Sequence, residues 1–224
     1  MRSFADILDF AARHHGSSEQ VINMAANDHA VADLTQTGDD RYLSEMAKAV
    51  FSAGFSWKVI RNKWQGFEAA FDGFQPHRVA FYADPDVDRL LSDKAIVRNG
   101  QKITATVANA RFILEIAQTH DTFGAFLQQW PDDDQAGLLA FFGKNGSRLG
   151  GATAQYFLRF SGYDAWIASP DVCAALVREN VLDKPSATSK SALRKVDAAM
   201  TDLHDQSQLP RAVISRVLAL SVGP

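Results

Sequence analysis

Apolar residues recur along this chain at spacings of three and four, as in amphipathic helices, and strand-like alternation is hardly seen. Polar caps, glycines and prolines divide this pattern into segments. The expected helices run from Phe4 to near Gly16, from Ser17 onward, from Asp39 to Gly54, from a cap at Ser56 through Phe71, from Pro76, from Pro85, from Gln101 to Gln118, in two or three pieces between Phe123 and Phe142, from Ala152 to Ser161, beyond Pro170, over Leu193–Leu203 and over Val213–Leu220. We therefore predict an all-α fold of two helical lobes with a cleft between them.

Several helix boundaries have local signals. Ser17 and Gln20 have the spacing of a capping box, with Ser17 as the N-cap and Gln20 reaching back to it. Asp39 and Asp40 are expected to supply an N-cap and a first-turn carboxylate to the third helix. The polar segment 183–190 is predicted to be a linker or an exposed loop.

Composition limits the classes of protein that the chain can represent. Its 224 residues are 46% hydrophobic and 22% charged, as in an ordinary globular protein. The formal net charge is −3, so a nucleic-acid partner would require basic residues gathered on one face. The single cysteine, Cys173, excludes an intramolecular disulfide and a multi-thiolate metal site. We see no signal peptide or membrane span and expect a cytoplasmic protein that does not bind membranes.

One short motif changes this picture. The segment Ala53-Gly54-Phe55-Ser56-Trp57 resembles the A-G-[LF]-S-W signature of type I 3-methyladenine-DNA glycosylases, which belong to the helix-hairpin-helix glycosylase superfamily. In that family the Trp stacks on an extruded base and a Glu eight residues earlier contacts the base. This chain keeps the Trp as Trp57, but Ala49 stands at the position of the Glu.

Three further segments extend the resemblance in the family's order. They are Phe67-Glu68-Ala69-Ala70-Phe71, the phrase from Asp93 to Arg111, and Gly151-Ala152-Thr153-Ala154-Gln155-Tyr156-Phe157. We expect a single glycosylase-like domain over 1–224, with a family-like core over about 39–161 and divergent helical extensions over 1–38 and 162–224.

The resemblance implies a reaction. It is hydrolysis of the N-glycosidic bond of an alkylated purine such as 3-methyladenine in DNA, by a monofunctional enzyme without a cofactor. The implied partner is damaged DNA, and we expect a monomer. No Lys lies between Gly146 and Tyr156, where this superfamily places the Lys of its Schiff-base chemistry.

The implied base-binding residues are Trp57, Phe55 and Ala49. An indole can stack on a flipped base and attracts a cationic methylated purine. Glu45 lies one helical turn before Ala49 and is the candidate catalytic carboxylate. On the residues alone, a core Trp57 and a solvated Glu45 remain open.

The implied DNA-binding residues surround a glycine turn. Gly150 and Gly151 would let backbone N–H groups approach a phosphate, with help from Arg148 and from Thr153 at the start of the next helix. An ordinary turn between packed helices remains the alternative. Arg98, Lys102 and Arg111 could form a basic stripe near the same cleft or be separately solvated.

The ends of the chain depart from the family. The terminal Cys and His residues that bind a structural zinc there have no counterpart here, since His14, His15, His29 and Cys173 lie in no matching motif. We therefore expect no metal. A rival hypothesis is a non-catalytic relative that binds DNA or a nucleobase. The enzyme hypothesis requires a carboxylate converging on Trp57, whereas the rival predicts an apolar or occluded pocket there.

Overall fold

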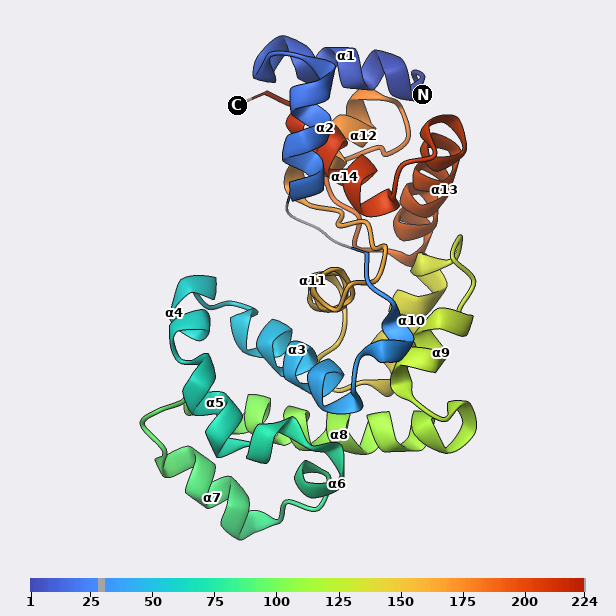
Figure 1. The fold of residues 1–224 in the computed structure, drawn as a ribbon. Coiled ribbons are helices and arrows are strands. Elements are labelled where there is room, and N and C mark those ends of the chain that lie inside the picture. Colours follow the sequence, from blue (N-terminus) through green and yellow to red (C-terminus); the bar gives the residue numbers. More distant parts are fainter. Residues whose placement is uncertain (28–30, 224) are drawn as a thin grey trace. The chain divides into compact units, whose positions relative to one another are not determined.

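The fold is described by a computed structural model that covers residues 1–27 and 31–223 (Figure 1). Helices and connecting segments make up these residues, with no strand among them, so the all-α prediction is confirmed. The helices are α1 (Phe4–His15), α2 (Ser18–Asn27), η1 (Leu34–Gln36), α3 (Asp39–Ser52), α4 (Trp57–Asn62), α5 (Trp64–Ala70), η2 (Asp72–Phe74), α6 (Pro76–Val79), α7 (Asp84–Ser92), α8 (Gly100–His120), α9 (Phe123–Gln129), α10 (Gln135–Asn145), α11 (Ala152–Phe160), α12 (Pro170–Arg178), α13 (Lys190–Ser207) and α14 (Arg211–Leu220).

The helices group into two compact units. Unit 1 comprises Met1–Ala32, Pro131–Leu138 and Leu158–Pro224, and unit 2 comprises Asp33–Trp130 and Leu139–Phe157. Helices α10 and α11 contribute residues to both.

Unit 2 is organised around α8, its longest helix (Figure 1). Helices α3, α6, α7 and α9 all pack against it. A stack of rings lies beside this helix layer, with Trp64 and Phe74 5.4 Å apart and Phe71 and Phe74 5.2 Å apart between ring centroids. Because these rings are supplied by α5 and the turn after it, the stack fixes that segment against α3.

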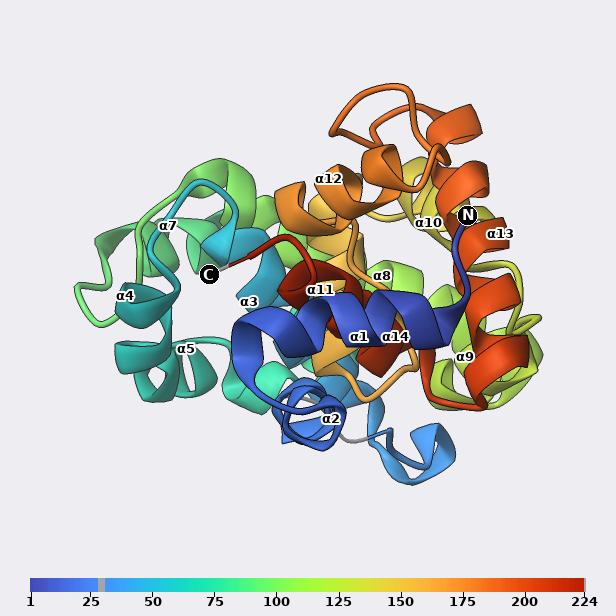
Figure 2. The same ribbon diagram turned by 90° about the horizontal axis from the view of Figure 1, so that it is seen from above.

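Unit 1 joins the two ends of the chain. Helices α1 and α2 pack against each other and against α14, which also contacts α12 (Figure 2). Ile7, Val21 and Ile214 are fully buried in this core. Glu179 is also buried and forms ion pairs with Arg178 and Arg2. The N-terminal helices are therefore held by the last helix of the chain.

Helix capping follows the sequence in some places and departs from it in others. The capping box at Ser17 is confirmed, because Gln20 Oε1 accepts from the Ser17 N–H and Ser17 Oγ accepts from the Gln20 N–H. The prediction of Asp39 as an N-cap was wrong. Gly38 occupies that position, and the Asp39 carboxylate accepts a hydrogen bond from the N–H of Phe123 instead.

The expected continuous helix from Ser56 through Phe71 was also wrong. It is divided into α4 and α5 at Lys63, whose φ and ψ are −96° and 0°. Lys63 Nζ donates to the carbonyl of Lys94, and a Cβ on Gly66 would lie 2.8 Å from the carbonyl oxygen of Ala95. Close packing of α5 on this loop thus overrides the continuous helical pattern. Ser56 holds the N-cap position of α4, but its side chain makes no capping hydrogen bond.

Candidate functional site

The Ala53–Trp57 segment forms the turn between α3 and α4. The Phe55 N–H donates to the carbonyl of Ser52 at 2.9 Å, and Gly54 has a φ of +71°. A residue with a side chain rarely adopts this backbone conformation, which explains glycine at this point. The turn places Trp57 at the first position of α4.

Lys102 of α8 fastens this turn. Its ammonium donates to the carbonyls of Phe51 and Ala53, at 3.0 and 2.7 Å, and so satisfies two carbonyls at the end of α3. Lys102 is only 8% exposed. Its burial lowers the pKa of the ammonium, and the charge of Arg148 acts in the same direction. Lys102 therefore holds the end of α3 in place by hydrogen bonds. The prediction that it belongs to an exposed basic stripe was wrong.

A pocket of about 540 Å³ lies next to the turn. Every residue that lines it belongs to unit 2. The lining consists of Ala49, Ser52, Ala53, Gly54, Phe55, Ser56, Trp57, Ala152, Thr153 and Tyr156. Trp57 and Tyr156 contribute two aromatic rings, with centroids 5.4 Å apart and planes tilted by 57°.

The predicted base-binding residues all lie in this lining. Ala49 is 3% exposed, Phe55 is 49% exposed, and Trp57 is half-buried. None of the ten lining residues, all of them in the described part of the chain, is an Asp or a Glu. The pocket therefore offers aromatic surface and neutral polar groups instead of a carboxylate.

Glu45 is not among the residues that line the pocket. Its carboxylate accepts a hydrogen bond from Lys48, and the Lys48 ammonium lies 4.9 Å from the centre of the Trp64 ring. The Glu45 side chain keeps 25% of its surface exposed. A catalytic role for Glu45 stays a prediction.

The predicted DNA-binding residues lie in and beside the turn between α10 and α11. Gly151 and Arg148 have φ values of +57° and +58°, and Gly150 and Gly151 are exposed. Arg148 is also exposed, and its guanidinium donates to the side chain of Gln101 in α8. Thr153 lines the pocket. The glycine turn and the aromatic pocket thus adjoin through the first turn of α11.

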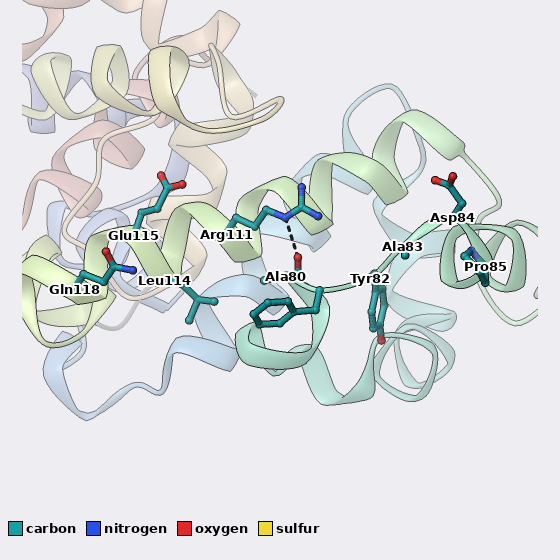
Figure 3. Close-up of a pocket in the computed structure, with 10 residues that line it drawn as sticks. Ala80, Tyr82, Ala83, Asp84, Pro85, Arg111, Leu114, Glu115 and Gln118 are labelled. Atoms are coloured by element: carbon teal, nitrogen blue, oxygen red, sulfur yellow. Dashed lines mark hydrogen bonds between the residues drawn. The ribbon is translucent and has the colours of Figure 1, made fainter.

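A second, larger pocket of about 730 Å³ lies on unit 2 between α8 and the segment before α7 (Figure 3). Arg111, Glu115 and Gln118 line it from α8, and Tyr82 lies on the other side. The Arg111 side chain donates to the carbonyl of Ala80 at 2.8 Å. Arg111 thus belongs to this pocket, and neither Arg111 nor Arg98 lines the pocket that contains Trp57.

Over residues 1–27 and 31–223, no group of three or more His, Cys, Asp or Glu side chains could hold a metal ion. Cys173 is buried, and burial raises the pKa of its thiol. His29 lies outside the described residues. Over the same ranges, each helix is too short or too polar to cross a lipid bilayer.

Residues 29–137 match the family model described as methyladenine glycosylase, and this range includes the Ala53–Trp57 turn. Over this range the chain is similar to methyladenine glycosylases. The pocket residues of α3 and α4 lie inside the matched range, whereas the glycine turn at 150–151 lies beyond it.

Two curated methyladenine glycosylases are similar to part of the chain. DNA-3-methyladenine glycosylase 1 of Escherichia coli (strain K12) is 35% identical over 92 residues, which is 39% of this chain and 49% of that protein. DNA-3-methyladenine glycosylase of Haemophilus influenzae (strain ATCC 51907 / DSM 11121 / KW20 / Rd) is 28% identical over 75 residues, or 34% of this chain and 40% of that protein. The matches thus span about half of the curated relatives or less.

Solved methyladenine glycosylases share the fold over a larger region. The structure of 3-methyladenine DNA glycosylase I from Staphylococcus aureus, which addresses 3-methyladenine recognition, is 28% identical, with a TM-score of 0.53 over 64% of this chain and 87% of that one. A variant of 3-methyladenine DNA glycosylase I in complex with 3-methyladenine is 27% identical, with the same TM-score, over 64% and 88% of the two chains.

Sequence reasoning missed three residues around the pocket. Tyr156 was part of a quoted motif, but its contact with Trp57 joins helices far apart in the chain. Ser52 gave no signal apart from its place before Ala53. Asn109 holds the glycine turn, since its amide donates to the carbonyl of Ser147 at 3.0 Å and accepts from the Ser147 N–H at 2.7 Å. Its position in the phrase Val107–Arg111 was the available clue.

Proposed function

We propose that this protein hydrolyses the N-glycosidic bond of an alkylated purine such as 3-methyladenine in DNA and leaves an abasic site. The observation that carries the proposal is the pairing of Trp57 and Tyr156 in one pocket beside the glycine turn. An extruded base needs flat apolar surfaces on which to stack, and these rings provide them.

The chemistry suits a pocket without a carboxylate. A 3-methylated adenine nucleotide carries a positive charge on the base, so the base leaves as a neutral molecule when the bond to the sugar breaks. Water supplies the oxygen that forms the new bond to the sugar carbon, and its proton passes to solvent. Because the leaving group needs no added proton, binding and orientation can supply much of the catalysis. The Trp57 ring would stabilise the cationic base before cleavage.

We also propose Glu45 as the acidic partner of this reaction. It shares α3 with Ala49, one turn earlier, and would have to leave Lys48 to approach the pocket. Glu45→Gln separates this role from stacking, because the amide keeps the size of the side chain and loses its charge. If Glu45→Gln and Lys48→Met lose base release to the same extent, the ion pair between the two residues is what matters. If only Glu45→Gln loses it, the result supports a catalytic role of the Glu45 carboxylate.

For the DNA strand, we propose contacts from Gly150, Gly151, Arg148 and Thr153. Exposed backbone N–H groups and one guanidinium suit phosphate oxygens. We further propose that the protein acts as a monomer in the cytoplasm. Sedimentation at increasing protein concentration and fluorescence microscopy of the tagged protein test these two points.

Trp57→Ala is expected to slow release of 3-methyladenine from methylated DNA by roughly ten- to a hundredfold, because base–aromatic stacking is worth about 1–3 kcal/mol. Chromatography of the released base measures the effect. Phe81→Ala is the matched control, since Phe81 is 78% exposed and lines the other pocket.

The absence of a carboxylate from the lining also favours a second candidate function, a protein that binds DNA or a nucleobase without cleavage. The same assay separates the two. If the folded parent protein binds methylated DNA but releases no base, the result would contradict the glycosylase proposal and support the binding protein.

A further inference from the structure

Ser52 lies in the last turn of α3, and its hydroxyl is buried without a hydrogen-bond partner among the described residues. The residue is 3% exposed and lines the pocket that contains Trp57. Most buried hydroxyls are paired, because an unpaired one loses its hydrogen bonds to water and gains none in return. Other buried hydroxyls of unit 2 follow this rule: Ser44 donates to Glu68, and Thr106 donates to the carbonyl of Lys102.

The position of Ser52 makes its unpaired state informative. A serine inside a helix commonly donates to the carbonyl four residues earlier, as Thr106 does in α8. Ser52 makes no such bond. One turn before it, the lining residue Ala49 offers no polar side-chain atom. Ser52 is therefore the polar group that α3 contributes to the pocket, and it is free to pair with a ligand.

We propose that the Ser52 hydroxyl hydrogen-bonds to the edge of the purine that enters this pocket and is a specificity-determining residue. The inference rests on the proposed function, since it takes the occupant to be a nucleobase. A hydroxyl can both donate and accept, so it can pair with a ring nitrogen or with an exocyclic amine. The base then becomes the hydrogen-bond partner that the Ser52 hydroxyl lacks, while the base lies against the rings of Trp57 and Tyr156.

This assignment also describes the class of ligand. The lining has no Asp or Glu, so the pocket selects a flat base by stacking and neutral hydrogen bonding. Free 3-methyladenine, which is neutral after release, should consequently bind the intact protein without any DNA. A pocket that recognised its ligand by charge would require the cationic nucleotide.

Free 3-methyladenine is the probe for the test. It is titrated calorimetrically into the parent protein, into Ser52→Ala and into Thr201→Val. Ser52→Ala is expected to weaken binding roughly tenfold, as for loss of one hydrogen bond in a buried site. Thr201→Val is the matched control, because its hydroxyl is also buried and unpaired among the described residues but lines a different pocket in unit 1. It should bind the base as the parent does.

A thermal melt of each variant separates a binding role from a structural one. Ser52→Ala removes an unpaired hydroxyl, so its Tm should equal or exceed that of the parent. A marked fall in Tm would assign Ser52 to the folding of α3 and overturn the proposal. So would unchanged base binding by Ser52→Ala, or a parent protein that does not bind the free base.

Base release from methylated DNA separates failure of this proposal from failure of the proposed function. If binding of free 3-methyladenine depends on Ser52 but the parent releases no base from methylated DNA, the role of Ser52 is supported and the proposed glycosylase function is contradicted. If the parent and Ser52→Ala release the base equally and bind free 3-methyladenine equally, the proposed glycosylase function is supported and the role of Ser52 is contradicted.

Discussion

At the scale of single residues, charged side chains that are buried or partly buried position helices in unit 2. The Glu68 carboxylate accepts hydrogen bonds from Arg41, Ser44 and Trp64, which joins α3 to α5. Lys102 does similar work at the other end of α3, where its ammonium holds two carbonyls. The helix that carries Ala49 and Ser52 is thus fixed near both of its ends before any ligand enters.

Glu68 leads to a prediction about pH. Burial by itself would raise the pKa of this carboxyl group, but the hydrogen bonds from Arg41, Ser44 and Trp64 and the charge of Arg41 together lower it below its ordinary value of 4.5. Because the unfolded chain then takes up the proton at higher pH than the folded one, the stabilisation is complete above pH 4.5 and is lost as pH falls through the folded-state pKa.

Glu68→Gln should accordingly lower the free energy of unfolding by roughly 1 kcal/mol at neutral pH. The difference from the parent should shrink as pH falls below 4.5. Urea unfolding of both proteins at a series of pH values measures it, and a difference that grows toward acid pH would contradict the argument.

Sequence reasoning reached part of the site at this scale. Trp57 and Ala49 could be found because the residues of one short motif are neighbours in the chain. Tyr156 and Lys102 contact the same turn from other helices, and a local sequence pattern cannot predict contacts between residues so far apart in the chain. Ser52 could not be found, because an unpaired hydroxyl is a property of the packed structure.

At the scale of elements, the glycine turn between α10 and α11 contains two glycines in different circumstances. Gly151 has a φ of +57°, which a side chain disfavours. Gly150 does not have a positive φ, and a Cβ there would meet nothing within 4 Å. The turn's shape therefore requires glycine at 151, whereas at 150 the fold would accept a side chain.

This difference predicts opposite outcomes for two substitutions. Gly151→Ala should lower the free energy of unfolding by roughly 1–2 kcal/mol, the cost of a left-handed residue with a Cβ. Gly150→Ala should leave stability unchanged and weaken DNA binding, because its methyl group would stand where a phosphate approaches. Urea unfolding and a fluorescence-anisotropy titration with duplex DNA measure the two effects. Unchanged DNA binding by Gly150→Ala would remove the glycine turn from the proposed DNA interface.

Helix positions could be predicted from the sequence more fully than the site. Helices α7 and α8 begin close to the expected residues because Pro85 and the apolar stripe after Gln101 are local signals. The division between α4 and α5 was missed because its cause is the loop at 94–95, which α5 meets through Gly66. Local pattern decides where a helix can form, and tertiary contact decided where this one ends.

At the scale of the whole molecule, a net charge of −3 limits how DNA can be held. The proposed binding of DNA cannot rely on a general attraction between a basic protein and a phosphate backbone, so it would depend on a few local cations. Arg148 and Lys144 are exposed and lie in or next to the glycine turn.

The dependence of DNA affinity on salt tests this. With about two phosphates neutralised, the slope of log K against log salt concentration should be about −2, and Arg148→Gln should reduce its magnitude by about 1. Lys184→Gln, at an exposed position in the segment before α13, is the control with the same change of charge. An equal change of slope in both variants would indicate that net charge, and not Arg148, governs binding.

The arrangement of unit 1 has a consequence for biosynthesis. Helices α1 and α2 leave the ribosome before α14, against which both pack. Their apolar faces, which include Ile7, Ala11 and Val21, must therefore remain uncovered while all of unit 2 is synthesised. Unit 2 can fold earlier, because all of its residues have been synthesised once Phe157 is added. The growing chain would fold its middle before its beginning, and a nascent chain arrested short of α14 would present those faces to chaperones and proteases.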